Sequence, residues 1–177
     1  MMCSPRSRDR AAGGVMVKSF LLSWLARKYS GADLAGFERD QPEDWLVWEA
    51  GPWRPPSAGR DTMLAAPVAR QASVGESLAI ALSARDGGPT VRLGRAPQND
   101  VVVDDGTLSR NHLVLRRAGD GGWTIEDAGS SNGSRVNGLR LGRAPVRLEP
   151  GARIEAGAVR FTFYDASTLY LRLRGAA

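Results

Sequence analysis

The only histidine of the chain, His112, stands three residues after Ser109 in "SRNH", a pair that could belong to a nucleophilic active site. A catalytic serine needs a histidine that is oriented by a carboxylate, together with donors for an oxyanion. Asp104, Asp105 or Asp127 could supply the carboxylate. However, the chain has no G-x-S-x-G turn and no phosphate loop ending in Lys-Ser or Lys-Thr. We therefore expect no catalytic residue and no enzyme activity.

The same region contains groups that suit the binding of an anion. A phosphate monoester carries about −1.5 to −2 charges and three acceptor oxygens. Guanidinium, hydroxyl and backbone N–H donors on turns between rigid strands can bind it. Arg95 ends one predicted strand, Ser109 and Arg110 precede the next, and Ser131 and Asn132 lie in the loop "DAGSSNGSRVNG". We expect these three loops to converge at one end of the domain.

Composition argues against metal and nucleic-acid sites. One cysteine, Cys3, and one histidine exclude an intramolecular disulfide and the usual cysteine- and histidine-rich metal clusters. The net charge of +5 favours anionic partners in general. Basic and acidic residues number ten and eight over residues 1–70, and fourteen and eleven over residues 71–177. Neither part is a polycation and no basic–aromatic platform is visible, so we do not expect nucleic-acid binding.

Elements that could position these loops begin near residue 75, where the pattern becomes that of β-strands. The hydrophobic fraction is 42%, and turn signals rich in glycine and proline recur every 8 to 12 residues or so. Asn137-Gly138 is a strong hairpin signal because both residues accept a positive φ. Trp123, in the middle of an alternating run, is expected in the core. The strands are expected within residues 77–84, 90–95, 100–103, 112–117, 122–127, 134–141 and 146–165. This pattern predicts an all-β sandwich, and residues 166–174 would form a closing helix.

The first third of the chain has a different character. Residues 15–29 have apolar side chains at helical spacing and predict a short amphipathic helix. Six acidic residues and two tryptophans follow between Asp33 and Glu49, and "WRPPSAGRD" is typical of a linker. The helix and the tryptophans could pack on their own domain or dock on a partner, and the helix could also dock on a membrane surface. The sequence leaves these alternatives open.

These patterns divide the chain into four parts. We expect a disordered tail over residues 1–15, a helix with an acidic Trp-rich segment and linker over 16–60, a β-domain over 70–165, and a helix or tail over 166–177. The apolar run near the start is interrupted by Lys18 and is too short for a membrane span. We therefore expect a cytoplasmic protein that keeps this start and does not insert into a membrane.

Several motifs together resemble the forkhead-associated (FHA) domain family. They are Gly94-Arg95, Ser109-Arg110-x-His112, the run Asp127-x-x-Ser130-Ser131-Asn132-Gly133-Ser134, Val136-Asn137-Gly138, and Leu148-x-Pro150-Gly151 followed by "IEAGAVRFTF". The resemblance covers about residues 70–165, with the motifs in the family's order. It implies an eleven-stranded β-sandwich whose apical loops bind phosphothreonine peptides, with no cofactor and no metal.

The resemblance also implies a role for individual residues. Arg95 would pair with the phosphate, Ser109 would donate its hydroxyl to it, and Arg110 would be a second cation. Ser131 would contact the phosphate or the backbone, and Asn132 would hold the main chain of the peptide. The supporting residues would be Gly94, His112, Asp127, Gly133, Asn137 and Gly138. Asp127 is also expected from its own chemistry to stabilise a turn, because aspartate accepts from nearby backbone N–H groups.

The partners that the resemblance implies are phosphothreonine-containing proteins, namely Ser/Thr kinases or their substrates. One alternative is a module that binds partners independently of phosphate through the Trp-rich residues 37–53. Another is that Thr62, once phosphorylated, occupies the site in cis at a high effective concentration.

Overall fold

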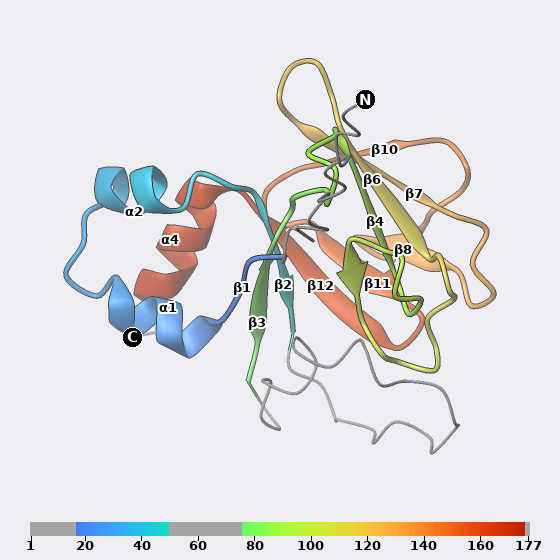
Figure 1. The fold of residues 1–177 in the computed structure, drawn as a ribbon, viewed down its shortest axis with the longest axis horizontal. Coiled ribbons are helices and arrows are strands. Elements are labelled where there is room, and N and C mark those ends of the chain that lie inside the picture. Colours follow the sequence, from blue (N-terminus) through green and yellow to red (C-terminus); the bar gives the residue numbers. More distant parts are fainter. Residues whose placement is uncertain (1–16, 50–75, 176–177) are drawn as a thin grey trace, which may run out of the picture.

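The structure, a computed structural model, describes residues 17–49 and 76–175. Within these ranges two β-sheets pack face to face, and three short helices lie together at one side of them (Figure 1). The expected tail 1–15, the linker with Trp53, and Thr62 lie outside the described residues.

The larger sheet has seven strands in the order β1-β3-β2-β12-β11-β8-β9, and all of its pairings are antiparallel. Its strands in chain order are β1 (Ser19–Leu21), β2 (Trp45–Trp48), β3 (Leu78–Ala81), β8 (Ser134–Val136), β9 (Leu139–Arg140), β11 (Arg153–Ala156) and β12 (Val159–Tyr164). Strands from the two ends of the chain therefore meet at its centre, where β2 pairs with β12.

The smaller sheet has five strands in the order β10-β7-β6-β4-β5, with β4 and β5 parallel and the other pairs antiparallel. Its strands in chain order are β4 (Thr90–Gly94), β5 (Val101–Val102), β6 (Leu113–Arg117), β7 (Trp123–Asp127) and β10 (Val146–Leu148). Alternate residues of β4, β6 and β7 are buried against the larger sheet, as the alternating sequence predicts. Trp123 is a core residue, with 3% of its surface exposed.

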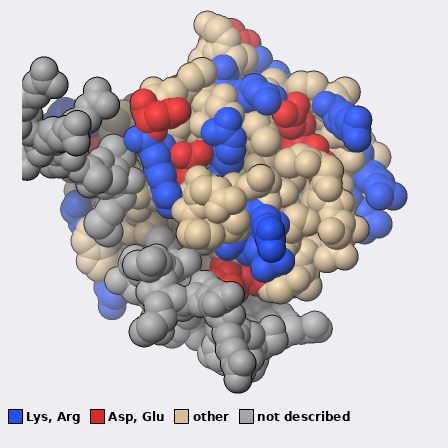
Figure 2. Space-filling view, turned by 45° about the vertical axis from the view of Figure 1, so that its right-hand side comes forward, with Lys and Arg blue, Asp and Glu red and all other residues tan. Residues whose placement is uncertain are grey.

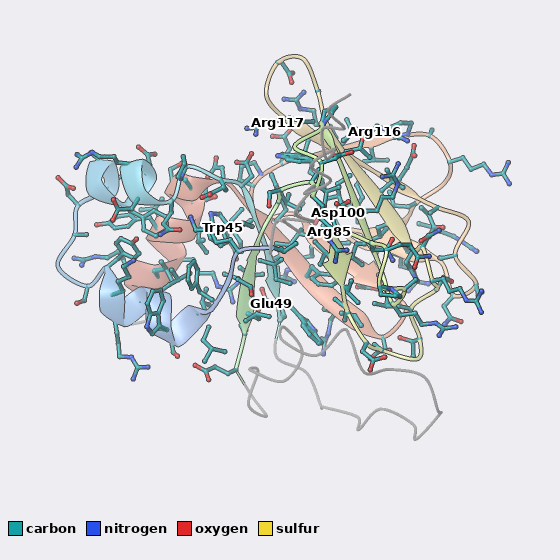
Figure 3. The ribbon with its side chains drawn as sticks, in the orientation of Figure 1. Trp45, Glu49, Arg85, Asp100, Arg116 and Arg117 are labelled. Carbon is teal, nitrogen blue, oxygen red and sulfur yellow. The ribbon has the colours of Figure 1, made fainter. Side chains whose placement is uncertain are left out.

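A second apolar cluster lies on the opposite face of β2 and β3, beneath the helices. The helices are α1 (Leu22–Lys28), α2 (Leu34–Asp40) and α4 (Ala166–Gly175). Trp45 points from β2 toward this layer and packs with Phe37 and Leu169, which are fully buried (Figure 3). Both faces of β2 are therefore covered, which explains why "WLVW" has no polar alternation. None of the helices within 17–49 and 76–175 has the length and apolar character needed to cross a membrane.

The all-β sandwich and its C-terminal helix are confirmed, with twelve strands in the described part of the chain against about eleven expected. The N-terminal part differs from the expectation. Residues 19–21 form a strand that pairs with β3, and the helix begins only at Leu22. The sequence pattern did not reveal this strand, because three extended residues are too few to disturb the helical spacing of the apolar positions. Strands β1 and β2, from the segment set apart as 16–60, belong to the seven-stranded sheet. Trp45 and Trp48 thus pack within their own chain.

Candidate functional site

Three loops meet at one end of the sandwich, as their polar residues predict. The loop after β4 joins the loop before β6 because the Arg95 N–H donates to the Ser109 carbonyl at 3.1 Å. The loop after β7 joins the same place, since the Ser131 N–H donates to Ser109 Oγ at 3.0 Å. Arg95, Ser109 and Ser131 therefore lie together although they come from three loops.

The two serine hydroxyls at the centre of the site are available to a ligand. Ser109 Oγ and Ser131 Oγ are 3.5 Å apart, which is a weak contact at most. Either hydroxyl can therefore turn toward a ligand oxygen without losing a strong hydrogen bond. Ser131 is exposed and Ser109 is half-buried.

Two guanidinium groups at this end are free to bind an anion. The side chains of Arg95 and Arg110 are exposed, and neither has a hydrogen-bond or ion-pair partner within residues 17–49 and 76–175. Their backbone is nevertheless fixed. The Arg110 carbonyl accepts from the Ala96 N–H at 3.1 Å and from Asn99 Nδ2 at 2.6 Å. A fixed backbone with an unpaired cation is what the binding of phosphate requires.

Gly94 allows this close packing of the loops. A Cβ at position 94 would lie 2.9 Å from Asn99 Nδ2 and even closer to the Arg110 carbonyl oxygen. Any side chain there would push the Arg110 loop away from β4. The supporting role expected for Gly94 is therefore steric. Asn99, fully buried, was missed by the sequence reasoning because a lone asparagine in a turn carries no distinctive signal.

His112 is fully buried and holds two loops together through its ring nitrogens. Nδ1 accepts from the Ser109 N–H at 2.9 Å, and Nε2 lies 3.4 Å from the Gly133 carbonyl, to which it can only donate. This pairing fixes the neutral form with the proton on Nε2. Burial lowers the pKa of His112, and the Gly133 carbonyl and Asp127 only partly oppose this. His112 contacts the backbone of Ser109 and not its hydroxyl, so it is not arranged as a general base for that serine.

Asp127 organises the loop that follows β7. Its carboxylate accepts from the N–H groups of Gly129 and Ser130, at 2.9 and 2.6 Å, and from the Ser134 hydroxyl at 2.5 Å. Burial raises the pKa of Asp127, but the hydrogen bonds from Ser134 and Ser130 outweigh it and hold the pKa below its ordinary value. The carboxylate is therefore charged and structural, as predicted. Gly133 follows with a φ of 72°, which suits glycine.

Asn132 is exposed at the edge of the site and is oriented by Thr107. Its Nδ2 donates to the Thr107 carbonyl at 2.7 Å. The Thr107 hydroxyl in turn accepts from the Ala158 N–H at 2.8 Å, in the turn between β11 and β12. Gly157 in that turn is required, since a Cβ there would collide with the Thr107 carbonyl. Sequence reasoning found Asn132 but missed Thr107, whose role depends on a residue 51 positions away.

Asn137 and Gly138 form the predicted hairpin turn between β8 and β9. Both have positive φ, 50° and 81°. Asn137 Oδ1 also accepts from the Arg153 N–H at 2.9 Å, which fixes the turn against β11. The turn lies at the end of β8 away from Asn132, so it can position the loop that carries Asn132 only through β8.

A comparison with family models matches residues 91–157 to the FHA domain. The matched range includes all three loops and every site residue considered above. The chain contains an FHA domain.

Several curated proteins are similar to this FHA domain. The oxoglutarate dehydrogenase inhibitor of Corynebacterium diphtheriae is 39% identical over 77 residues, which cover 44% of this chain and 52% of that protein. The glycogen accumulation regulator GarA of Mycolicibacterium smegmatis is 38% identical over 78 residues, covering 42% of this chain and 46% of that protein. The chain thus spans about half the length of the curated relatives it matches.

Solved structures of FHA domains are also similar. The FHA domain of the CT664 protein from Chlamydia trachomatis is 24% identical with a TM-score of 0.48, over 70% of this chain and 97% of that one.

Proposed function

We propose that this FHA domain binds a phosphothreonine-containing segment of a partner protein at the three-loop site. One observation carries the proposal. The Ser109–Ser131 contact brings two hydroxyls together at the end of the sandwich where Arg95 and Arg110 are exposed and unpaired. Such a cluster has the charge and the donors that a phosphate dianion requires.

In this proposal each residue has a separate task. Arg95 pairs with the phosphate, Ser109 and Ser131 donate to its oxygens, and Arg110 adds a second positive charge. Asn132 holds the main chain of the peptide, for which its bond to Thr107 orients it in advance. His112, Gly94 and Asp127 keep the three loops in place and do not contact the ligand.

A preference for phosphothreonine over phosphoserine has to come from more than the extra methyl group. Burial of one methyl contributes about 0.8 kcal/mol, which is roughly fourfold in affinity. A stronger preference requires that the site also restrict the rotamer of the phosphorylated side chain, which is stiffer for threonine.

The proposed role is binding and not catalysis. The relatives are, by their names, an inhibitor of an enzyme and a regulator of glycogen accumulation. By analogy we place the chain in Ser/Thr kinase signalling in the cytoplasm, with a kinase or a kinase substrate as its partner. A site built on Trp45 or Trp48 is not favoured as a second candidate, because both side chains pack into the fold.

The test is a titration with a phosphothreonine peptide library against Arg95→Ala. A charge-assisted hydrogen bond contributes about 1.5–3 kcal/mol, so affinity should fall by about 10- to 150-fold. The matched control is Arg92→Ala, which removes an exposed arginine from β4, three residues before Arg95. Equal binding by Arg95→Ala and the wild-type chain would refute the site.

A further inference from the structure

Among the described residues, the helices cover only part of the outer face of the seven-stranded sheet, and a row of charged residues lies on another part of it. Arg140 on β9 is paired with Arg135 on β8, Arg135 with Glu155 on β11, and Glu155 with Arg160 on β12. Directly paired residues of antiparallel strands project from the same face. These four residues therefore cross the sheet side by side, and we call them the arginine row.

The arginine row has more positive than negative charge, and most of that charge is unpaired. Within residues 17–49 and 76–175 its one ion pair is between Arg135 and Glu155, at 3.8 Å, with side chains 61% and 45% exposed. Arg140 and Arg160 are exposed, and their guanidinium groups have no hydrogen-bond or ion-pair partner in the described part of the chain. Arg153, two residues before Glu155 on β11, is also exposed and has a side chain without such a partner there.

The outer face of the five-stranded sheet is different. There Arg116 pairs with Glu126 at 2.5 Å, and Arg147 pairs with Asp120 and Glu149. Its exposed cations are thus largely neutralised within the chain. Arg92 on β4 is the exception, since it is exposed and its side chain has no such partner among the described residues. The larger sheet differs because three arginines stand there in one row of directly paired positions.

The arginine row is continuous with the proposed phosphothreonine site. Asn132 and Gly133 line one shallow pocket together with Arg135, Arg140 and Glu155. The Arg140 guanidinium lies beside Gly133, since a Cβ built on that glycine would be 3.6 Å from it. A peptide whose main chain is held by Asn132 can therefore continue directly onto the row.

We propose that the arginine row binds an acidic segment of the same partner that the FHA domain holds through its phosphothreonine. This inference rests on the proposed function. Neighbouring strands are about 4.8 Å apart, so Arg140 and Arg160, three strands apart, are separated by roughly 14 Å. An extended chain advances about 3.3 Å per residue. The segment that fits is thus about four to six residues long, rich in aspartate or glutamate, and close to the phosphothreonine.

The charge pattern favours an acidic peptide over a nucleic acid. Glu155 stands in the middle of the row, where it would repel a continuous phosphate backbone, whereas a peptide can place a neutral or basic residue there. The arginine row also contains no aromatic side chain on which a base could stack. Figure 2 shows basic and acidic side chains interspersed on the face in view, without a single continuous basic surface.

The experiment compares two sets of phosphothreonine peptides with the full chain. One set has alanine, serine and glycine around the phosphothreonine, and the other has aspartate and glutamate on one side of it. We expect peptides that are acidic on one side of the phosphothreonine to bind more tightly than neutral ones. The gain should be about 2- to 30-fold if two exposed ion pairs contribute about 0.2–1 kcal/mol each. Arg140→Ala/Arg160→Ala should remove this advantage while neutral peptides bind as before. The advantage should also shrink with added salt, because the contacts are exposed.

Controls separate the possible failures. Arg92→Ala/Arg143→Ala removes two exposed arginines outside the row and should keep the advantage, with equal thermal stability of both double variants confirming that they fold. If acidic and neutral peptides bind the wild-type chain equally, or the Arg140→Ala/Arg160→Ala variant keeps the full advantage, this inference is overturned and the proposed function stands. If neither peptide set binds the wild-type chain, the proposed function itself fails. If the Arg140→Ala/Arg160→Ala variant loses binding to single-stranded RNA or anionic vesicles but keeps the peptide advantage, the arginine row binds that other ligand and this inference is overturned.

Discussion

Gly94→Ala should damage both the stability of the FHA domain and its site, because there is no room for a side chain at this position. The added methyl would collide with the Arg110 carbonyl and lie 2.9 Å from Asn99 Nδ2. Both neighbours are themselves held, since the Arg110 carbonyl accepts from the Ala96 N–H and from Asn99. Relief of the collision must therefore move the loop and weaken these hydrogen bonds.

The magnitude follows from two contributions. Overpacking of a well-packed site costs about 1–3 kcal/mol, and each weakened hydrogen bond costs about 1 kcal/mol. The free energy of unfolding should fall by about 2–4 kcal/mol, a large part of the 5–15 kcal/mol of a typical domain. Phosphopeptide affinity should fall as well, by about tenfold, because Ser109 and Arg110 move together with the carbonyl.

Urea unfolding of the full chain, followed by peptide titration of the folded variant, measures both effects. Gly106→Ala is the matched control, because Gly106 lies in the loop before β6 and a Cβ there has no neighbour within 4 Å. That variant should unfold at nearly the wild-type urea concentration. If Gly94→Ala were as stable as Gly106→Ala and bound peptide equally well, the steric argument for Gly94 would be wrong.

Two further predictions concern charge. The pKa of His112 is lowered in the folded chain, so the unfolded chain takes up a proton first as the pH falls. The free energy of unfolding of the wild-type chain should therefore decline below about pH 6.5. The His112→Gln variant should lack this decline between about pH 6.5 and 5. A wild-type stability that is flat across that range would contradict the buried neutral imidazole. Arg172 donates to Glu49 at 2.6 and 2.8 Å; burial raises the pKa of Glu49, but this pair and the Thr162 hydroxyl outweigh it and keep the pKa low. Arg172→Met should therefore destabilise the chain by about 1–3 kcal/mol at pH 7, and the difference from wild type should shrink as acid protonates Glu49. Arg39→Met, at an exposed position of α2, should be neutral. An unchanged unfolding midpoint for Arg172→Met would refute the role of this pair.

Local signals in the sequence were sufficient for most of the sandwich. The Asn137-Gly138 turn could be predicted because its positive φ values are a property of those two residues. Strand β2 could not be predicted in this way, because a strand with both faces buried shows no alternation of polar and apolar residues. Its tryptophans left open whether the segment packs on its own domain or docks on a partner, and in the structure Trp45 fills the space between the sheet and the helices (Figure 3).

The candidate site likewise contains residues that the sequence revealed and residues that it did not. Ser109, Ser131 and Asn132 could be found because they stand in recognisable loops. Thr107 and Asn99 could not, because each acts through a backbone carbonyl that only the folded chain brings near. The arginine row escaped notice for a related reason. Its members come from four strands, and only their register puts them on one line.

The central position of β2 also constrains the order in which this protein can form during synthesis. Leu46 pairs with Phe163, so the middle of the larger sheet joins residues that are more than one hundred positions apart. Such non-local pairing is slow and must wait until the later strand has been made. While the ribosome is still adding residues before β12, the apolar "WLVW" strand has no partner on that side and is exposed to aggregation or to chaperones. The nascent chain therefore cannot complete its larger sheet until β12 has left the ribosome, although every phosphate-contacting residue that we propose is made earlier.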